Sequence, residues 1–197
     1  KPAGTTSLVL GTSSGIHAWH NEFYIRRLRV GKNEPIYKYL LAHNPDLVQD
    51  EYFRPHDTAV IEIPQSAPKG SIMRTESAFD LLERVKKVAT EWVKPGHRTG
   101  SNSHNVSATI SLKKHEWDKA GKWMWDNREC YNGLAVLPYD GGSYTQAPFE
   151  DITEREFNKR VKLLNDVDLS KIIETTDETD LSGELACAGG SCEITSL

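Results

Sequence analysis

The sequence has few cysteines and no long apolar run, and these absences exclude several classes of protein. Its 197 residues include only three cysteines, too few for a disulfide-stabilised scaffold. No stretch approaches the length of a membrane-spanning helix, and no signal peptide is visible. These features predict a cytoplasmic protein that acts away from membranes.

A strongly basic surface is also absent. The formal net charge is −4, from 24 basic and 28 acidic residues. Residues 166–197 hold eight of the acidic residues and one basic residue, which leaves 23 basic and 20 acidic residues in residues 1–165. This small excess suits an anionic small ligand and argues against direct binding of nucleic acid.

Two of the three cysteines lie close together near the C-terminus. Cys187 and Cys192 are separated by four residues that include Gly189 and Gly190, so the backbone between them can close a small ring. Zinc would need four ligands, and there is no second cysteine pair, so no metal site is predicted. A structural disulfide here would constrain little of the unfolded chain. Thiol–disulfide exchange is the favoured interpretation, with two incidental cysteines as the alternative.

The residues before this pair are polar and acidic. Residues 166–184 are rich in threonine, aspartate and glutamate and have too little apolar surface to form a core. We therefore predict two parts, a folded body over residues 1–165 and a mobile acidic tail over residues 166–197 that carries the dithiol.

Hydrophobic periodicity predicts alternating strands and helices in the body. An alternating strand at 58–63 is expected to stop at Pro64, and a helix at 75–93 is expected to stop at Pro95. Thr153 and Glu156 form a capping-box pattern at the start of the last helix, which is predicted to run through residue 164. The further predictions are strands at 23–30, 106–112 and 132–138, the last of them buried, and helices at 35–42 and 114–127. The order indicates an α/β fold and favours parallel strands.

Three loops are candidate ligand sites, because α/β folds bind ligands in loops that follow strands. The first combines small residues and hydroxyls before a short helix, which suits a phosphate, although an ordinary capped turn fits equally well. It consists of Pro2, Ala3, Gly4, Thr5, Thr6 and Ser7. No Gly-Lys-Ser/Thr follows it, so it is not a Walker loop. The other two are 97–105 and 139–148.

Several segments together resemble the large catalytic subunit of ribonucleotide reductase. Pro2 to Ser7 is similar to the loop that holds the substrate phosphates in that family, and Cys187 and Cys192 lie where the family keeps its C-terminal redox pair. The other matching segments are Gly15-Ile-His17, Tyr24-Ile-Arg-Arg27, Asn105-Val-Ser-Ala-Thr109 and Asn132-Gly-Leu-Ala-Val-Leu-Pro138. The resemblance implies a C-terminal fragment of an α/β barrel with a flexible redox tail. Lys1 at the start of the sequence agrees with a fragment.

The resemblance also implies a class within that family. Ala135 and Val136 stand where the di-iron class has adjacent tyrosines for radical transfer, and the sequence lacks a glycyl-radical segment near its end. The adenosylcobalamin-dependent class remains, so the implied cofactor of the complete enzyme is adenosylcobalamin. The implied substrate is a ribonucleoside di- or triphosphate, reduced by radical chemistry at the ribose 2′ carbon.

In that family the active-site thiols end each turnover as a disulfide inside the barrel, and the tail dithiol reduces it before thioredoxin or a similar dithiol restores the tail. The run from Asp166 to Cys187 would span roughly 25 Å as a random coil, and tethering would keep the dithiol at a concentration on the order of millimolar.

One expected motif is missing. The family's radical cysteine lies in an Asn-x-Cys-x-Glu loop, which this sequence does not contain, and Cys130 does not match it. We therefore expect the chain alone to be inactive and to need the N-terminal remainder of the reductase. The alternative is a non-catalytic remnant, or a nucleotide-phosphate binding module, whose tail only exchanges electrons with thioredoxin.

Overall fold

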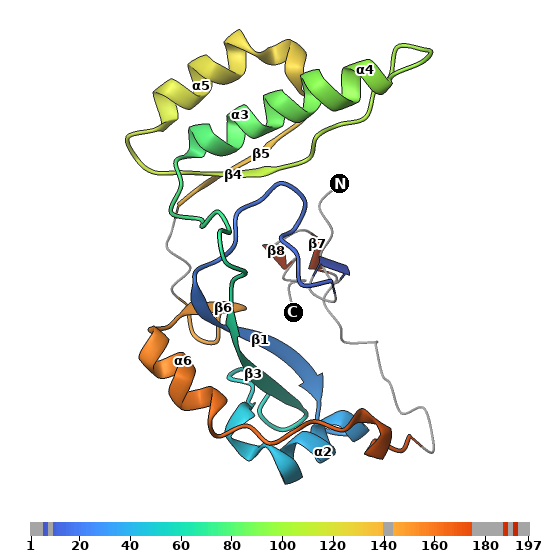
Figure 1. Cartoon of the computed structure of the whole chain (residues 1–197), viewed down its shortest axis with the longest axis vertical. Helices are drawn as coiled ribbons and strands as arrows, with labels where there is room; N and C mark the ends of the chain where they lie inside the picture. Colours follow the sequence, from blue (N-terminus) through green and yellow to red (C-terminus); the bar gives the residue numbers. More distant parts are fainter. Residues whose placement is uncertain (1–5, 8–9, 140–143, 175–186, 189–190, 193–197) are drawn as a thin grey trace. The chain divides into compact units, whose positions relative to one another are not determined.

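The chain folds as two compact units. The structure, a computed structural model, describes residues 6–7, 10–139, 144–174, 187–188 and 191–192. One unit is formed by residues 1–22 and 67–141, and the other by residues 23–66 and 142–197 (Figure 1). The predicted mixture of helices and strands is confirmed, and closure of a barrel stays a prediction.

The first unit is built around a strand–helix–strand crossover. Strands β4 (Thr109–Leu112) and β5 (Ala135–Pro138) are parallel and are connected through α5 (Trp117–Asp126) and a short turn at Arg128–Cys130. Parallel neighbours require such a long connection, so the pairing here follows the predicted α/β order. Strand β4 begins at Thr109, three residues later than expected.

The core of this unit lies between the two strands and the amphipathic helix α3 (Ala78–Val88). Apolar residues at helical spacing on α3, among them Leu82 and Val85, are fully buried against Ile110 and Leu112 of β4. The Ser77 hydroxyl and the Asp80 carboxylate cap the helix reciprocally, as a capping box. The helix continues as a π-helical turn at Ala89–Val93 and a last turn, α4 (Lys94–Gly96). Pro95 therefore lies within the last turn, and the helix ends one residue after it.

Strand β5 differs from its prediction. Its apolar sequence predicted a buried strand, but Leu137 is 51% exposed and Ala135 is also exposed. Among the described residues β5 pairs with β4 alone, so one edge of the strand has no neighbour. A continuous apolar run is buried only where both edges and both faces are covered, which explains the error.

The second unit contains a four-stranded sheet in the order β2-β3-β1-β6. Strands β1 (Phe23–Gly31) and β3 (Thr58–Ser66) pair along nine residues, and the shorter β2 (Val48–Asp50) and β6 (Phe149–Asp151) flank them. Every pairing in this sheet is antiparallel, so the expectation of parallel strands is wrong here. Strand β3 also continues through Pro64. Strand β2 pairs with residues 59–61, so within the described ranges Pro64 lies on an open edge, where a missing N–H is tolerated.

Two helices contact opposite faces of this sheet. On one face, Ile61 and Val30 pack with Tyr39 and Leu40 of α2 (Pro35–His43). On the other face, the Phe23 ring lies 5.1 Å from that of Phe157 in α6 (Glu154–Val161). Helix α6 ends three residues before the predicted Leu164.

The predicted capping box of α6 is half correct. The Thr153 hydroxyl accepts a hydrogen bond from the Glu156 N–H at 3.2 Å. The Glu156 carboxylate instead accepts one from Arg160 Nε at 3.0 Å. An ion pair at this helical spacing thus takes the place of the reciprocal cap.

Glu51 provides a prediction of pH dependence. Its buried carboxylate accepts hydrogen bonds from the Phe53 and Arg54 N–H groups, at 2.6 and 2.8 Å, and from Arg29. Burial alone would raise the pKa of Glu51, but these bonds outweigh burial and lower it from 4.5. Because the pKa of Glu51 is lower in the folded chain than in the unfolded chain, its carboxylate adds stability above pH 4.5. This stability is lost as the pH falls through the pKa of the folded state.

We therefore expect Glu51→Gln to destabilise the chain at neutral pH, with a difference from wild type that shrinks below about pH 4.5. Urea unfolding of both proteins at several pH values measures this. A difference that stays constant with pH would contradict the assignment.

None of the helices in the described part of the chain is long and apolar enough to cross a membrane.

Candidate functional site

The two C-terminal cysteines occupy facing positions in a small hairpin. Strands β7 (Cys187–Ala188) and β8 (Ser191–Cys192) are antiparallel, and Cys187 is the direct register partner of Cys192. Facing residues of an antiparallel pair have Cα atoms about 4.5–5.5 Å apart, which lies within the range found for disulfides. The two residues between the strands, Gly189 and Gly190, lie outside the described residues. The backbone register is thus compatible with a reversible disulfide.

The chain between α6 and this hairpin contacts helix α2. Leu164 and Ile172 pack against the apolar cluster of Tyr39, Leu40, Leu47 and Ile61. The Asn165 N–H donates to Asn44 Oδ1 at 2.7 Å, and Asn44 Nδ2 donates back to the Asn165 carbonyl at 3.3 Å. The two hydrogen bonds join residues 121 positions apart in sequence, and nothing in the local pattern predicted them.

The arginines of β1 face internal partners. Arg27 donates to Glu62 at 2.7 Å and also contacts Glu150, while Arg29 contacts Glu51 at 3.3 Å. Burial alone would lower the pKa of Arg27, but its hydrogen bonds to Glu150 and Glu62 raise it. Since these guanidinium groups are already paired with carboxylates, the ion-paired interpretation fits them better than binding of an external anion.

Arg26 has a different environment from its two neighbours. Its guanidinium lies 4.2 Å from the centre of the Phe149 ring, an arrangement typical of a cation–π contact. Burial lowers its pKa. The guanidinium thus packs against the ring of its cross-strand neighbour, and its buried Nε has no hydrogen-bond partner among the described residues.

Only the end of the predicted phosphate loop is described. The Thr6 and Ser7 carbonyls accept hydrogen bonds from the N–H groups of Leu10 and Thr12, at 3.0 and 2.9 Å, and Ser7 is buried. Pro2, Ala3, Gly4 and Thr5 lie outside the described residues. Binding of phosphate by this loop stays a prediction.

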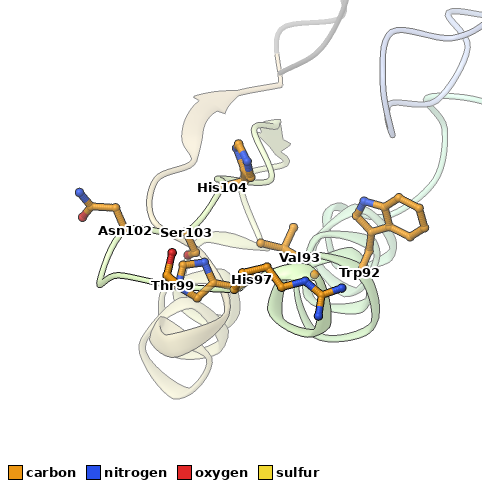
Figure 2. Close-up of a pocket in the computed structure, with 9 residues that line it drawn as sticks. Trp92, Val93, His97, Thr99, Asn102, Ser103 and His104 are labelled. Atoms are coloured by element: carbon orange, nitrogen blue, oxygen red, sulfur yellow. The ribbon is translucent and has the colours of Figure 1, made fainter.

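The second candidate loop, residues 97–105, lines an open pocket together with the end of the preceding helix (Figure 2). The pocket has a volume of about 690 Å³, and Trp92 and Asn102 lie on opposite sides of it in Figure 2. His97 Nε2 is held 2.8 Å from the Gly100 carbonyl oxygen. Pockets of this volume enclose drug-sized ligands. No contact in this lining identifies a ligand, and we assign no residue of the pocket to a cofactor.

The third candidate loop, residues 139–148, is described only in part, since residues 140–143 lie outside the described residues. Gln146 adopts a positive φ of 54° and donates to the Asp50 carbonyl at 2.8 Å, while its side-chain oxygen accepts from the Tyr52 N–H at 2.9 Å. These bonds attach the loop to the end of β2, which is a structural role.

The surroundings of His17 and of Cys130 bear on metal binding. His17 Nδ1 donates to the Ser14 carbonyl at 2.7 Å, and Nε2 accepts from the Thr109 N–H at 3.0 Å, so both ring nitrogens are engaged within the unit. Within the described residues, no group of three or more His, Cys, Asp or Glu could hold a metal ion. Cys130, at the end of the turn after α5, is a partly buried free thiol.

Comparisons with known proteins extend over nearly the whole chain. No family model matches it. The adenosylcobalamin-dependent ribonucleoside-triphosphate reductase of Lactobacillus acidophilus is 27% identical over 198 residues, which cover 98% of this chain and 26% of the relative. The enzyme of the same name from Euglena gracilis is 29% identical over 187 residues, which cover 90% and 24%.

A solved structure shares the fold. A B12-dependent class II ribonucleotide reductase matches with a TM-score of 0.69 and 24% identity, covering 87% of this chain and 23% of that one. Along 98% of its length, therefore, the chain is similar to adenosylcobalamin-dependent ribonucleoside-triphosphate reductases, and it spans about a quarter of their length.

Proposed function

We propose that the chain is the C-terminal part of an adenosylcobalamin-dependent ribonucleotide reductase and that its Cys187–Cys192 pair reduces the active-site disulfide after each turnover. The observation that carries the proposal is the similarity over 98% of the chain to reductases of that name. The facing register of the two cysteines adds support, since a dithiol that closes a small ring can leave a mixed disulfide rapidly.

The exchange proceeds in two steps that transfer two electrons. One tail thiolate attacks a sulfur of the active-site disulfide, forming a mixed disulfide and releasing one active-site thiolate, which takes a proton. The second tail thiolate then attacks the tail sulfur of the mixed disulfide. This step forms the Cys187–Cys192 disulfide and releases the second active-site thiol. Thioredoxin, or another dithiol of that class, reduces the tail disulfide by the same chemistry.

The substrate of the complete enzyme is a ribonucleoside di- or triphosphate. The loop formed by residues 2–7 would hold its phosphates through backbone N–H groups and hydroxyls, because that composition suits an anion at a helix start. Adenosylcobalamin would supply the radical that starts reduction at the 2′ carbon. No step assigned to this chain involves the cofactor, and the radical cysteine would come from the N-terminal remainder of the reductase.

A reconstitution experiment tests this proposal. A complete protein that contains this chain should form deoxyribonucleotide from ribonucleotide only when adenosylcobalamin and a dithiol reductant are both present. The 197-residue chain alone should form none under the same conditions, because it lacks the Asn-x-Cys-x-Glu loop. Product that forms without adenosylcobalamin, or product formed by the isolated chain, would overturn the proposal.

A further inference from the structure

The segment that carries the dithiol, from residue 162 to Cys192, is called the redox arm here. It stays attached to the folded body beyond Val161, where the last helix, α6, ends. Helix α6 ends at Val161, yet Leu164 and Ile172 both pack on the apolar cluster that α2 shares with the sheet. The described residues after α6 therefore follow the surface of α2 as far as Ile172. The composition of residues 166–184 alone predicted a tail that is mobile from Asp166.

Hydrogen bonds from the last turn of α2 fasten this segment. Asn44, which is 2% exposed, exchanges two bonds with the Asn165 backbone. Asn165 Nδ2 donates to the His43 carbonyl at 2.6 Å, and the Asp168 N–H donates to the Tyr39 hydroxyl at 3.0 Å. Backbone groups at two points of the segment thus depend on two side chains of α2 and its C-cap.

The Tyr39 hydroxyl is itself held in place. Its ring is buried and stacks on the His43 ring with 4.2 Å between centroids. The Asp168 carboxylate also accepts the Ser170 N–H at 3.1 Å, which closes a short turn directly before Ile172. The acceptor for the Asp168 N–H therefore has a fixed position, and so does the turn that follows.

From these contacts we infer that Tyr39 and Asn44 form an arm clamp: they are positioning residues that fix the root of the redox arm and thereby set the local concentration of its dithiol at the active site. The inference rests on the proposed function of Cys187 and Cys192. With the clamp closed, 14 residues separate Ile172 from Cys187, whereas 25 separate Val161 from Cys187 when it is open. Once a random-coil linker is long enough to span its two sites, the local concentration at its end falls with about the −3/2 power of its length, so release should dilute the dithiol about two- to threefold.

The test compares Tyr39→Phe/Asn44→Ala with wild type in the complete enzyme. The double variant should turn over about two- to threefold more slowly when thioredoxin is the reductant and the arm is limiting. With saturating dithiothreitol, a dithiol small enough to reach a buried disulfide without the arm, its rate should equal that of wild type. Tyr37→Phe, on the same helix, is the matched control and should leave both rates unchanged.

Hydrogen exchange provides a readout independent of turnover. In the double variant the Asn165 and Asp168 amides should lose protection, because their acceptors are removed, while the Phe157 amide in α6 keeps its protection. Unchanged exchange at Asn165 and Asp168 would overturn the clamp.

The outcomes separate the clamp from the proposed function. Equal loss of thioredoxin-driven and dithiothreitol-driven turnover would mean a general structural defect and would also overturn the inference. If Cys187→Ser stops thioredoxin-driven turnover but the double variant does not slow it, the clamp alone is wrong. If Cys187→Ser has no effect, the proposed function itself fails.

Discussion

Replacing Cys187 by serine in the complete enzyme should abolish continuous turnover with thioredoxin while leaving a single pre-reduced round intact. In the proposed mechanism the active-site thiols supply the two electrons of the first round, so that round needs no arm. Every later round would require reduction of a disulfide inside the proposed barrel, out of reach of a protein the size of thioredoxin, and one tail sulfur cannot complete the exchange. Rapid-quench measurement of deoxyribonucleotide separates the first round from later rounds.

Cys192→Ser should behave in the same way, and in either variant a mixed disulfide between the remaining tail cysteine and the active site should accumulate because no second thiol resolves it. Cys130→Ser is the control, since this cysteine lies in the other unit, at the end of a short turn. Cys130→Ser should leave the yield of the first round and the rate of the later rounds unchanged. Continuous turnover at the wild-type rate in either tail variant would refute the proposed role of Cys187 and Cys192.

The second large effect concerns stability. Glu62 lies in the middle of β3 with only 2% of its side chain exposed, and it contacts Arg27, Arg160 and Gln49 at 2.7–3.1 Å. Glu62→Ala would leave the guanidinium of Arg27, whose side chain is 9% exposed, without its central partner. Removing one member of a buried ion pair costs about 3–5 kcal/mol, a large share of the stability of an ordinary domain. Equilibrium unfolding in urea measures the change.

Glu150→Ala is the matched control, because Glu150 contacts the same arginine from a position where its side chain is 51% exposed. Exposed ion pairs contribute about 1 kcal/mol or less, so this variant should lose far less stability. If the two variants unfold at the same urea concentration, the burial of Glu62 does not make its ion pairs contribute more stability than the exposed pair of Glu150.

Much of the secondary structure follows from the sequence, because its signals are local. The apolar stripe along residues 78–89 and the alternation at 58–63 are complete within one helix and one strand, and both elements form. Pairing direction is not local. The order of strands and helices favours parallel neighbours, yet β1 and β3 pair antiparallel although the 26 residues between them, which include α2, exceed the 22 residues between the parallel β4 and β5.

The site shows the same contrast. The Cys187–Cys192 pair can be recognised from spacing and glycines alone, whereas the Asn44–Asn165 contact joins residues far apart in sequence and has no local signature. Glu62 is an intermediate case. A single carboxylate between Ile61 and Ile63 in an apolar strand indicates a buried partner, but only the fold identifies Arg27 and Arg160 as the partners.

The measurement that tests the central claim most directly is the yield of deoxyribonucleotide from fully pre-reduced complete enzyme with no reductant added. Each chain would carry two dithiols, one in the active site and one in the arm, and each dithiol supports one reduction. We therefore expect about two products per chain from wild type and about one from Cys187→Ser or Cys192→Ser. Equal yields from wild type and the tail variants would contradict the claim that this pair supplies electrons to the active site.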